Sequence, residues 1–392
     1  MGAGRVLFYV QHLLGIGHLK RAASLVQAMT RAGLEVTLVT GGVPVPGLVF
    51  EAAQCVQLPP ASAADLSFRT LLDASGVPVD DAWKQGRRDL LLSAWRRFDP
   101  HAVVIELFPF GRRQMRFELL PLLDAALAAA RPPVLVSSVR DVLGGGQADL
   151  VRQDQMLETF ERYFDHVLVH GDAALIPFDR TFRHAARLGA RMHYTGYVVG
   201  PSSELPPVAT PSRRAQGEVL VSVGGGAVGL QLLETAIAAR PLTSLCAHPW
   251  RLLAGVNARG EDVAGLERLA QAAPGVQVER YRADFQQLMA RCRLSVSQGG
   301  YNTVMDILQT RTAAVVVPFA GGAEVEQSLR AHLLADRGWI ELVEEASLSP
   351  LVLAQAVDRA AARAAPTGLS VDLDGARNSA TLVAQWIEER CA

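Results

Sequence analysis

A repeated order of short apolar runs, glycine turns and helical segments constrains the fold of this chain more than any other feature. The clearest example is the segment 294–331, where a short apolar strand precedes a turn at Gly299 and Gly300. A helix-forming segment, a second apolar strand at residues 313–317 and Pro318 follow. This order is typical of a βαβ unit. Because strands of buried parallel sheets are short and apolar throughout, the repeated unit predicts an α/β fold.

The alternation of strands and helices occurs in two series, separated by a segment without periodicity. The first series predicts a Rossmann-like domain over residues 1–203. Pro, Ser and charged residues predict a linker at residues 204–217. The second series predicts another Rossmann-like domain over residues 218–374, with one of its strands at residues 242–247. A final helix is expected over residues 375–392.

Composition limits the classes of function that the chain can have. Of its 392 residues 49% are hydrophobic, so a sizeable core is available, and the net charge of -1 argues against a general nucleic-acid binder. Cys55, Cys246, Cys292 and Cys391 lack metal-ligand spacing, which favours free thiols in a reduced cytoplasm. Neither a signal peptide nor an apolar run of transmembrane length is recognised, which predicts a cytoplasmic protein and leaves peripheral contact with the inner face of the membrane open.

Two basic stretches of the first half have different interpretations. The helical segment that carries Arg87 is expected to place its arginines on a solvated face. The segment that begins at Phe108 mixes aromatic side chains with Arg112, Arg113 and Arg116. It could meet an anionic acceptor or a membrane, although short charge clusters usually face water.

Two glycine turns of the second half suit a diphosphate group. Gly224, Gly225 and Gly226 precede one helical segment, and Gly299 and Gly300 precede another. Glycine lets the backbone approach a ligand closely, and the start of a helix offers free N–H groups and a partial positive charge. The alternative for each is an ordinary tight turn between a strand and a helix. A P-loop is excluded because no Gly-Lys-Ser/Thr sequence follows.

The first loop of the chain contains Gly15 and Gly17 but does not match a dinucleotide fingerprint. A third glycine is missing, and the second strand ends at Thr40 without an acidic residue. Later in this half, Arg140 and Asp141 stand at the end of a predicted strand. There Arg140 could stabilise phosphate charge and Asp141 could orient a base, or the two could form an ordinary ion pair.

Two motifs of the chain resemble those of known glycosyltransferases. The later motif is Gly300-Tyr301-Asn302-Thr303, Asp306, Pro318 and Glu326-Gln327, and it resembles the donor-sugar motif of GT-B glycosyltransferases. The earlier motif, Gly15-Ile16-Gly17-His18-Leu19-Lys20-Arg21-Ala22, is similar to that of the MurG-like branch and of a group of predicted bacterial glycosyltransferases. The resemblance covers most of the chain. It implies a GT-B fold, in which two Rossmann-like domains face each other across a cleft and the final helix crosses back to the first domain.

The resemblance also implies roles for particular residues. His18 is the candidate base, since an imidazole near its ordinary pKa can take the proton of an acceptor hydroxyl. It could instead cap the helix or bind an acceptor phosphate, and His12 is its competitor in the same loop. Asp306 is expected at the ribose, Glu326 and Gln327 at the transferred sugar. The full expected donor site is Gly17, Gly224, Gly225, Gly226, Gln298, Gly299, Gly300, Asn302, Thr303, Asp306, Glu326 and Gln327, with Tyr281 and Arg282 as weaker candidates for contact with the nucleotide base.

Three departures from the family pattern leave the sugar open. Gln298 stands where many relatives have histidine, and Asp306 stands where the usual acid is glutamate. The common Gly-x-Pro before the last strand of the motif is Arg311-Thr312-Ala313 in this chain.

The resulting expectation is an inverting, metal-independent glycosyltransferase. It would move N-acetylglucosamine or another hexose from a UDP-sugar to a hydroxyl of a small molecule, a glycan or a lipid-linked sugar. No cofactor beyond the nucleotide sugar is expected, and no Asp-x-Asp cluster offers a Mg²⁺ site. Two alternatives remain open, namely a nucleotide-sugar 2-epimerase of the same architecture and a nucleotide-sugar-binding protein without catalysis.

Overall fold

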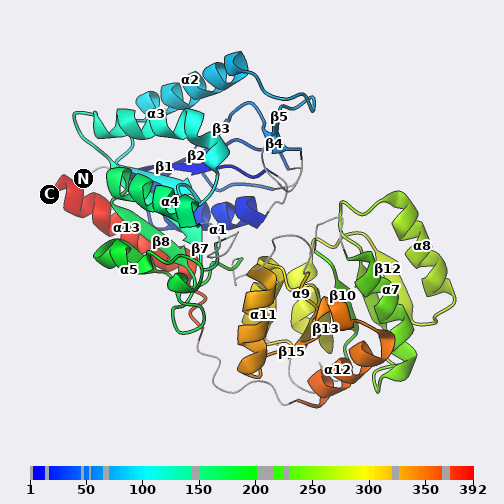
Figure 1. Ribbon diagram of the computed structural model, residues 1–392. Coiled ribbons are helices and arrows are strands. Elements are labelled where there is room, and N and C mark those ends of the chain that lie inside the picture. The colour runs from blue at the N-terminus through cyan, green and yellow to red at the C-terminus, as the bar shows by residue number, and fades with distance from the viewer. Residues whose placement is uncertain are drawn as a thin grey trace. The chain divides into compact units, whose positions relative to one another are not determined.

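The computed structural model divides the chain into two compact units, each built on a parallel sheet (Figure 1). Unit 1 comprises Met1–Gly200 and Val371–Ala392, and unit 2 comprises Pro201–Ser370. The residues that the structure describes are 3–13, 17–45, 48–52, 54–64, 70–143, 150–200, 216–224, 229–319, 326–363 and 371–392.

The sheet of unit 1 has the strand order β3-β2-β1-β6-β7-β8-β9, and all its pairings are parallel. Its strands are β1 (Arg5–Val10), β2 (Glu35–Thr40), β3 (Gln54–Gln57), β6 (Ala102–Glu106), β7 (Val134–Arg140), β8 (His166–His170) and β9 (Met192–Tyr194). A separate antiparallel pair joins β4 (Ser62–Ala63) to β5 (Leu71–Leu72). The order of the sheet reverses between β1 and β6, because the chain runs outward from β1 in one direction and then returns to its other side.

Helices cover both faces of this sheet, which explains why its strands are apolar throughout. They are α1 (Gly17–Arg31), α2 (Asp81–Phe98), α3 (Arg116–Leu127), α4 (Leu150–Tyr163), α5 (Ala185–Leu188) and α13 (Gly375–Cys391). Val6 and Phe8 of β1 pack in the cluster of α1 and α13, whereas Leu7 and Tyr9 pack in the cluster of α2, α3 and α4. The terminal helix α13 thus belongs to the core of unit 1, where Trp386 stacks on His166 at 3.8 Å between ring centroids.

Helix α2 begins at a polar cap and buries one arginine. Asp80 accepts a hydrogen bond from the Trp83 N–H at 2.7 Å, which satisfies a free donor of the first turn. The expectation of a solvated face is wrong for Arg87, whose side chain is fully buried. Its Nε donates to Glu118 of α3 at 2.7 Å, and its other donors reach the Gly41 carbonyl at 2.9 Å and Gln11. Burial is tolerated because these acceptors, together with Pro59 O and Tyr9 Oη, satisfy the guanidinium.

Unit 2 repeats the architecture with the strand order β12-β11-β10-β13-β14-β15. The strands are β10 (Val219–Ser222), β11 (Trp250–Leu253), β12 (Val276–Glu279), β13 (Leu294–Ser297), β14 (Ala314–Val316) and β15 (Glu341–Leu342). The helices are α7 (Leu230–Ala239), α8 (Gly260–Gln271), α9 (Phe285–Arg291), α10 (Tyr301–Thr310), α11 (Glu326–Asp336) and α12 (Pro350–Ala362). Here the order reverses between β10 and β13, which pair directly with Ser222 opposite Ser297.

The strand expected at residues 242–247 is wrong. The Cys246 N–H donates to the Thr243 carbonyl at 3.2 Å and the His248 N–H to the Leu245 carbonyl at 3.1 Å, so the backbone turns. Leu242 is 52% exposed, and the buried strand of this region is β11, which follows Pro249. The residues between Pro241 and Pro249 thus form turns, and the strand of this region begins after them at Trp250.

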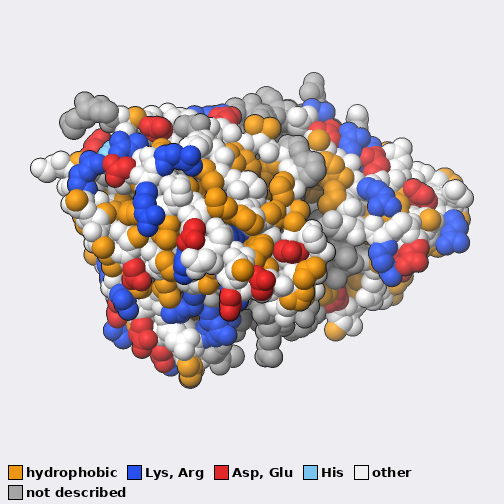
Figure 2. Space-filling model, turned by 90° about the horizontal axis from the view of Figure 1, so that it is seen from above, with side chains coloured by type: hydrophobic (Ala, Val, Ile, Leu, Met, Phe, Trp, Pro, Cys, Tyr) orange, Lys and Arg blue, Asp and Glu red, His pale blue; other side chains and the backbone are white. Residues whose placement is uncertain are grey.

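Three general features of the chain are the distribution of charge on the surface, the state of the cysteines and the apolar character of the helices. Figure 2 shows basic, acidic and hydrophobic side chains interspersed over the face that it presents. The four cysteines are free. Among the described residues, no helix combines the length and the apolar character that crossing a membrane requires.

The buried pair between Arg87 and Glu118 gives a test of the packing of unit 1. The substitution Glu118→Gln should lower the free energy of unfolding of unit 1 by about 3 kcal/mol, because it leaves the Arg87 charge buried without its counter-charge. Urea unfolding followed by circular dichroism measures the change. The matched control is Arg88→Met, the next residue of the same helix, whose exposed contacts should contribute less than about 1 kcal/mol. Equal effects of the two substitutions would contradict the role given to the buried pair.

Candidate functional site

The loop after β1 brings a histidine to the point where the strand order of unit 1 reverses. β1 ends at Val10, α1 begins at Gly17, and His18 lies in the first turn of α1. The strand on the reversal side of β1 is β6, which ends at Glu106. Ligands of open parallel sheets bind outside the carboxyl ends of the strands at such a reversal. The strand order therefore places His18 and Glu106 where a substrate site is expected.

Contact between His18 and Glu106 is the central feature of this site. The Nδ1 atom of His18 lies 2.7 Å from Oε1 of Glu106, whose side chain is fully buried, while that of His18 is 16% exposed. Arg21, one turn further along α1, donates to the same carboxylate oxygen. An ionised carboxylate only accepts hydrogen bonds, so the Nδ1–H of His18 donates to it. The neutral ring then has its lone pair at Nε2, where it can accept a proton.

Electrostatics keep the ring neutral and the carboxyl ionised. Burial lowers the pKa of His18 to about 3, although Glu106 opposes part of this effect. Burial alone would raise the pKa of Glu106, but the contacts with His18 and Arg21 outweigh it and hold that pKa well below its usual range. At neutral pH the pair is therefore an imidazole beside a carboxylate. The lowered pKa of His18 differs from the near-ordinary value that the sequence analysis expected of the base.

Two further arginines add positive charge around this pair. Arg112 donates from Nε to the Gln11 carbonyl at 2.6 Å, and its charge contributes to the lowered pKa values of both His18 and Glu106. Arg140 ends β7, the next strand after β6, and its charge also lowers the pKa of His18. The expected residue Asp141 is fully buried and accepts a hydrogen bond from the Tyr197 hydroxyl at 2.8 Å. The carboxylate that orients His18 is thus that of Glu106.

His12, the competing candidate, is oriented differently. Its side chain is buried, and its Nε2 lies 2.9 Å from the Val43 carbonyl, to which the neutral ring donates. Gly42 lies against the ring so closely that a Cβ at that position would be 2.2 Å from Cε1. Burial also lowers the pKa of His12. His12 is thus bonded to a backbone carbonyl, whereas His18 is bonded to the carboxylate of Glu106.

Glu106 and Arg21 are the site residues that the sequence analysis did not single out. Glu106 closes an apolar strand, so the rule that selected Arg140 and Asp141 at the end of the next strand applies to it equally. Arg21 lies within the first motif at helical spacing from His18. Both signals were present, but choosing Glu106 required knowledge that β6 lies beside β1.

In unit 2 the expected donor residues gather at the reversal between β10 and β13. Gly224 follows β10 with φ +69°, and Gly299 follows β13 with φ +71°, a conformation that favours glycine. A Cβ on Gly299 would lie 2.4 Å from Cγ1 of Val316, so close packing also requires glycine there. Gly300 caps α10, and Gln298 before it is buried. Gly225 and Gly226 lie outside the described residues.

The remaining donor candidates lie on α10, α11 and the segments beside them. Asn302 and Thr303 are in the first turn of α10, and Asp306 in the next turn accepts a hydrogen bond from the Gln286 amide at 2.6 Å. Glu326 begins α11 and forms an ion pair with the buried Arg330 at 3.2 Å.

The last three candidates, Gln327, Tyr281 and Arg282, differ in how their side chains are held. The Gln327 side-chain oxygen accepts the Phe319 N–H at 3.2 Å. Tyr281 is 58% exposed and Arg282 pairs with Asp284, so neither is held within the core. Among the described residues, no group of three His, Cys, Asp or Glu side chains is placed to hold a metal ion.

Comparison with known proteins finds a family match in unit 2 and relatives that cover a larger part of the chain. Residues 220–367 match the family described as glycosyltransferase family 28 C-terminal domain. The chain is 26% identical over 277 residues to the UDP-N-acetylglucosamine--N-acetylmuramyl-(pentapeptide) pyrophosphoryl-undecaprenol N-acetylglucosamine transferase of Granulibacter bethesdensis, which is 69% of this chain and 65% of that protein. The chain thus spans less than two thirds of the length of the curated relatives that it matches.

Solved structures agree over nearly the whole chain. The glycotransferase of kitacinnamycin superposes with a TM-score of 0.63 at 16% identity and covers 100% of both chains. MurG of Acinetobacter baumannii superposes with a TM-score of 0.59 at 15% identity and covers 98% of this chain and 99% of its own. At these identities the likeness concerns the fold, which confirms the expected GT-B architecture of two Rossmann-like units. The chain therefore has the GT-B fold, and its residues 220–367 match the glycosyltransferase family 28 C-terminal domain.

Proposed function

We propose that this chain is an inverting glycosyltransferase that moves a hexose, N-acetylglucosamine in the first instance, from a UDP-sugar to an acceptor hydroxyl without a metal ion. The observation that carries the proposal is the neutral His18 held by Glu106 at the strand reversal of unit 1. The family 28 domain of unit 2 supports a nucleotide-sugar donor.

In the proposed reaction, the acceptor hydroxyl loses its proton to Nε2 of His18 as its oxygen attacks the anomeric carbon. The bond between that carbon and the β-phosphate oxygen breaks, and its electron pair leaves with UDP. Attack from the face opposite the leaving group inverts the configuration of the sugar. Glu106 stabilises the imidazolium that forms and keeps the proton on Nδ1, so that Nε2 faces the hydroxyl as an acceptor.

Unit 2 supplies the donor site of this proposal. The turns at Gly224 and at Gly299 would present backbone N–H groups to the diphosphate, and the N-terminal ends of α7 and α10 would add positive potential as its charge develops. Asp306 accepts hydrogen bonds and so suits the ribose hydroxyls. Glu326 and Gln327 are proposed for the transferred sugar.

The acceptor is proposed at the level of a hydroxyl compound. The Granulibacter relative is named for an acceptor that carries pyrophosphoryl-undecaprenol, so a lipid-linked sugar belongs in the acceptor panel together with soluble glycans and small molecules. A cytoplasmic location at the inner face of the membrane accompanies the proposal, and the free cysteines are compatible with it.

Donor binding tests the role of unit 2. UDP and UDP-N-acetylglucosamine should raise the melting temperature, because a ligand at 100 times its Kd adds about 2.7 kcal/mol to the native state. The substitution Asp306→Ala should weaken UDP binding about tenfold through the loss of charge-assisted hydrogen bonds. Asp336→Ala, at the exposed end of α11, is the control for removal of an acid from unit 2. Failure of every nucleotide sugar of the panel to stabilise the protein would contradict the donor site.

Turnover tests the role of the pair in unit 1. His18→Ala and Glu106→Gln should each lower kcat by about 10² to 10⁴, since one removes the base and the other favours a proton on Nε2. UDP release in the presence of the acceptor panel measures kcat, and UDP binding should persist in both variants. His184→Ala, which removes another histidine of unit 1 that pairs with an acid, is the control.

The same assays separate the alternatives. Near-normal turnover of His18→Ala would remove it as the base. A 2-epimerase would convert the UDP-sugar without acceptor and without release of UDP. A binding protein without catalysis would bind UDP and release none from any donor.

A further inference from the structure

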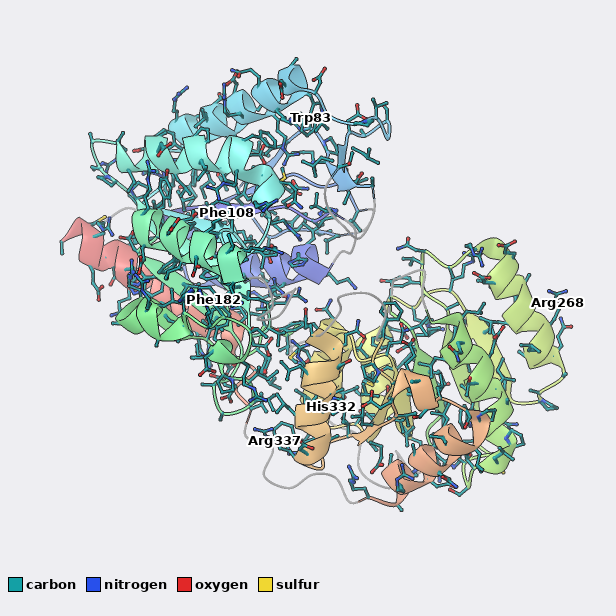
Figure 3. The ribbon with its side chains drawn as sticks, in the orientation of Figure 1. Trp83, Phe108, Phe182, Arg268, His332 and Arg337 are labelled. Atoms are coloured by element: carbon teal, nitrogen blue, oxygen red, sulfur yellow. The ribbon has the colours of Figure 1, made fainter. Side chains whose placement is uncertain are left out.

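Asp306 of α10, which is proposed for the ribose hydroxyls, is held by a glutamine of the helix α9. The side-chain amide of Gln286 donates to Oδ1 of Asp306 at 2.6 Å, and Asp306 is only 8% exposed. Gln286 lies in the first turn of α9, and Asp306 lies in the second turn of α10. Figure 1 labels α9, and Figure 3 draws the side chains of unit 2, with His332 of α11 as a labelled landmark. The contact thus joins two helices that the strand β13 separates in the sequence.

The two helices pack against each other and are tied by a hydroxyl group. Thr312, which follows α10, donates from its hydroxyl to the Met289 carbonyl of α9 at 2.8 Å. Within α10, the Thr310 hydroxyl donates to the Asp306 carbonyl at 2.7 Å. Because these bonds fix α9 against α10, Gln286 is in reach of Asp306 before any ligand arrives. A preorganised group loses less entropy on binding than a mobile one.

The hydrogen bond from Gln286 orients the carboxylate of Asp306. The last torsion of an aspartate side chain has a broad energy minimum, so an aspartate without such a bond presents its oxygens in a range of directions. A donor fixed on Oδ1 narrows this range. An ionised carboxylate accepts about four hydrogen bonds over its two oxygens, so the bond from one amide is compatible with further bonds from sugar hydroxyls. Orientation matters most for a ligand that offers two neighbouring hydroxyls at a fixed spacing, as ribose does.

We propose that Gln286 is a positioning residue that makes the donor site select ribonucleotides over deoxyribonucleotides. This role rests on the proposed function, in which Asp306 binds the ribose of the donor. An oriented carboxylate accepts hydrogen bonds from both neighbouring hydroxyls of ribose, whereas deoxyribose offers only one of them. A buried site that hydrogen-bonds a hydroxyl discriminates strongly against an analogue that lacks it. The donor class is therefore a ribonucleoside-diphosphate sugar, and thymidine-diphosphate sugars, which contain deoxyribose, are poor donors.

Titration calorimetry of the full chain with UDP and with its deoxyribose analogue, deoxy-UDP, measures this selectivity. The unchanged protein should bind UDP at least about tenfold more tightly than deoxy-UDP, since one hydrogen bond to a charged group is lost. Gln286→Met keeps the length of the side chain and removes the amide. It should weaken UDP binding about fivefold and change deoxy-UDP binding by less than about twofold, so that the two affinities converge. The matched control is Gln287→Met, which replaces the next glutamine of the same helix and should leave both affinities unchanged.

A double-mutant cycle shows whether Gln286 acts through Asp306. Asp306→Ala should itself remove the selectivity between UDP and deoxy-UDP. In that background Gln286→Met should then have no further effect, because the carboxylate that the amide orients is absent. A purely structural role of Gln286 in the packing of α9 would instead weaken the binding of both nucleotides by the same factor, with Asp306 present or absent.

The comparison of selectivities decides the proposal. Loss of selectivity in Gln286→Met, with the selectivity of Gln287→Met unchanged, supports it. Equal selectivity of the unchanged protein and Gln286→Met overturns it, as does an equal loss of affinity for both nucleotides. Equal binding of UDP and deoxy-UDP by the unchanged protein also overturns it, while the donor site stands because UDP still binds. Failure of the unchanged protein to bind either nucleotide contradicts the donor site of the proposed function, and the role of Gln286 with it. Circular dichroism with an unchanged melting temperature shows that the variants are folded.

Discussion

The hydrogen bond from His18 to Glu106 is the interaction on which the functional account depends. It joins the first turn of α1 to the end of β6, two segments far apart in the sequence that meet because β1 and β6 pair in parallel. The bond decides which ring nitrogen carries the proton, and Arg21, which donates to the same oxygen of Glu106, helps to keep the carboxylate ionised. A lone histidine in an exposed loop would have neither property. The contact between His18 and Glu106 thus depends on the strand order of unit 1 as well as on the two residue types.

The strand order of unit 2 also reverses, between β10 and β13, but the residues at the reversal are of another kind. The reversal lies beside the first strand of the unit, and the described residues that follow the two strands there include Gly224, Gln298, Gly299 and Gly300. Glycines there take positive φ angles or lie against neighbouring side chains, so they offer backbone N–H groups where side chains would intervene. In the proposed reaction, unit 1 would accept the proton of the acceptor hydroxyl and unit 2 would hold the negatively charged leaving group. Both sites would then lie where the strand order of a parallel sheet reverses.

Local sequence patterns predicted much of the fold and part of the candidate site. The features that they missed all depend on which segments become neighbours in the folded chain. Apolar strand runs, the turn at Gly299 and the position of His18 were all accessible, because periodicity and glycine conformation are local properties. Glu106 was not singled out, since its role depends on which strands become neighbours. Arg87 was expected at the surface, but it is buried by acceptors from four separate segments that no helical pattern contains. Residues 242–247 were expected to form a strand, but their backbone forms turns outside the sheet. Tertiary context decided each case.

The tautomer and pKa of His18 test the central claim most directly. Long-range proton–nitrogen NMR spectra of the histidine side chains, assigned with a His18→Gln variant, report both. We expect a neutral ring at pH 7 with its proton on Nδ1, and a pKa of His18 lowered to about 3, below its ordinary value of about 6.5. A proton on Nε2 at pH 7, or a titration midpoint near 6.5, would contradict this expectation.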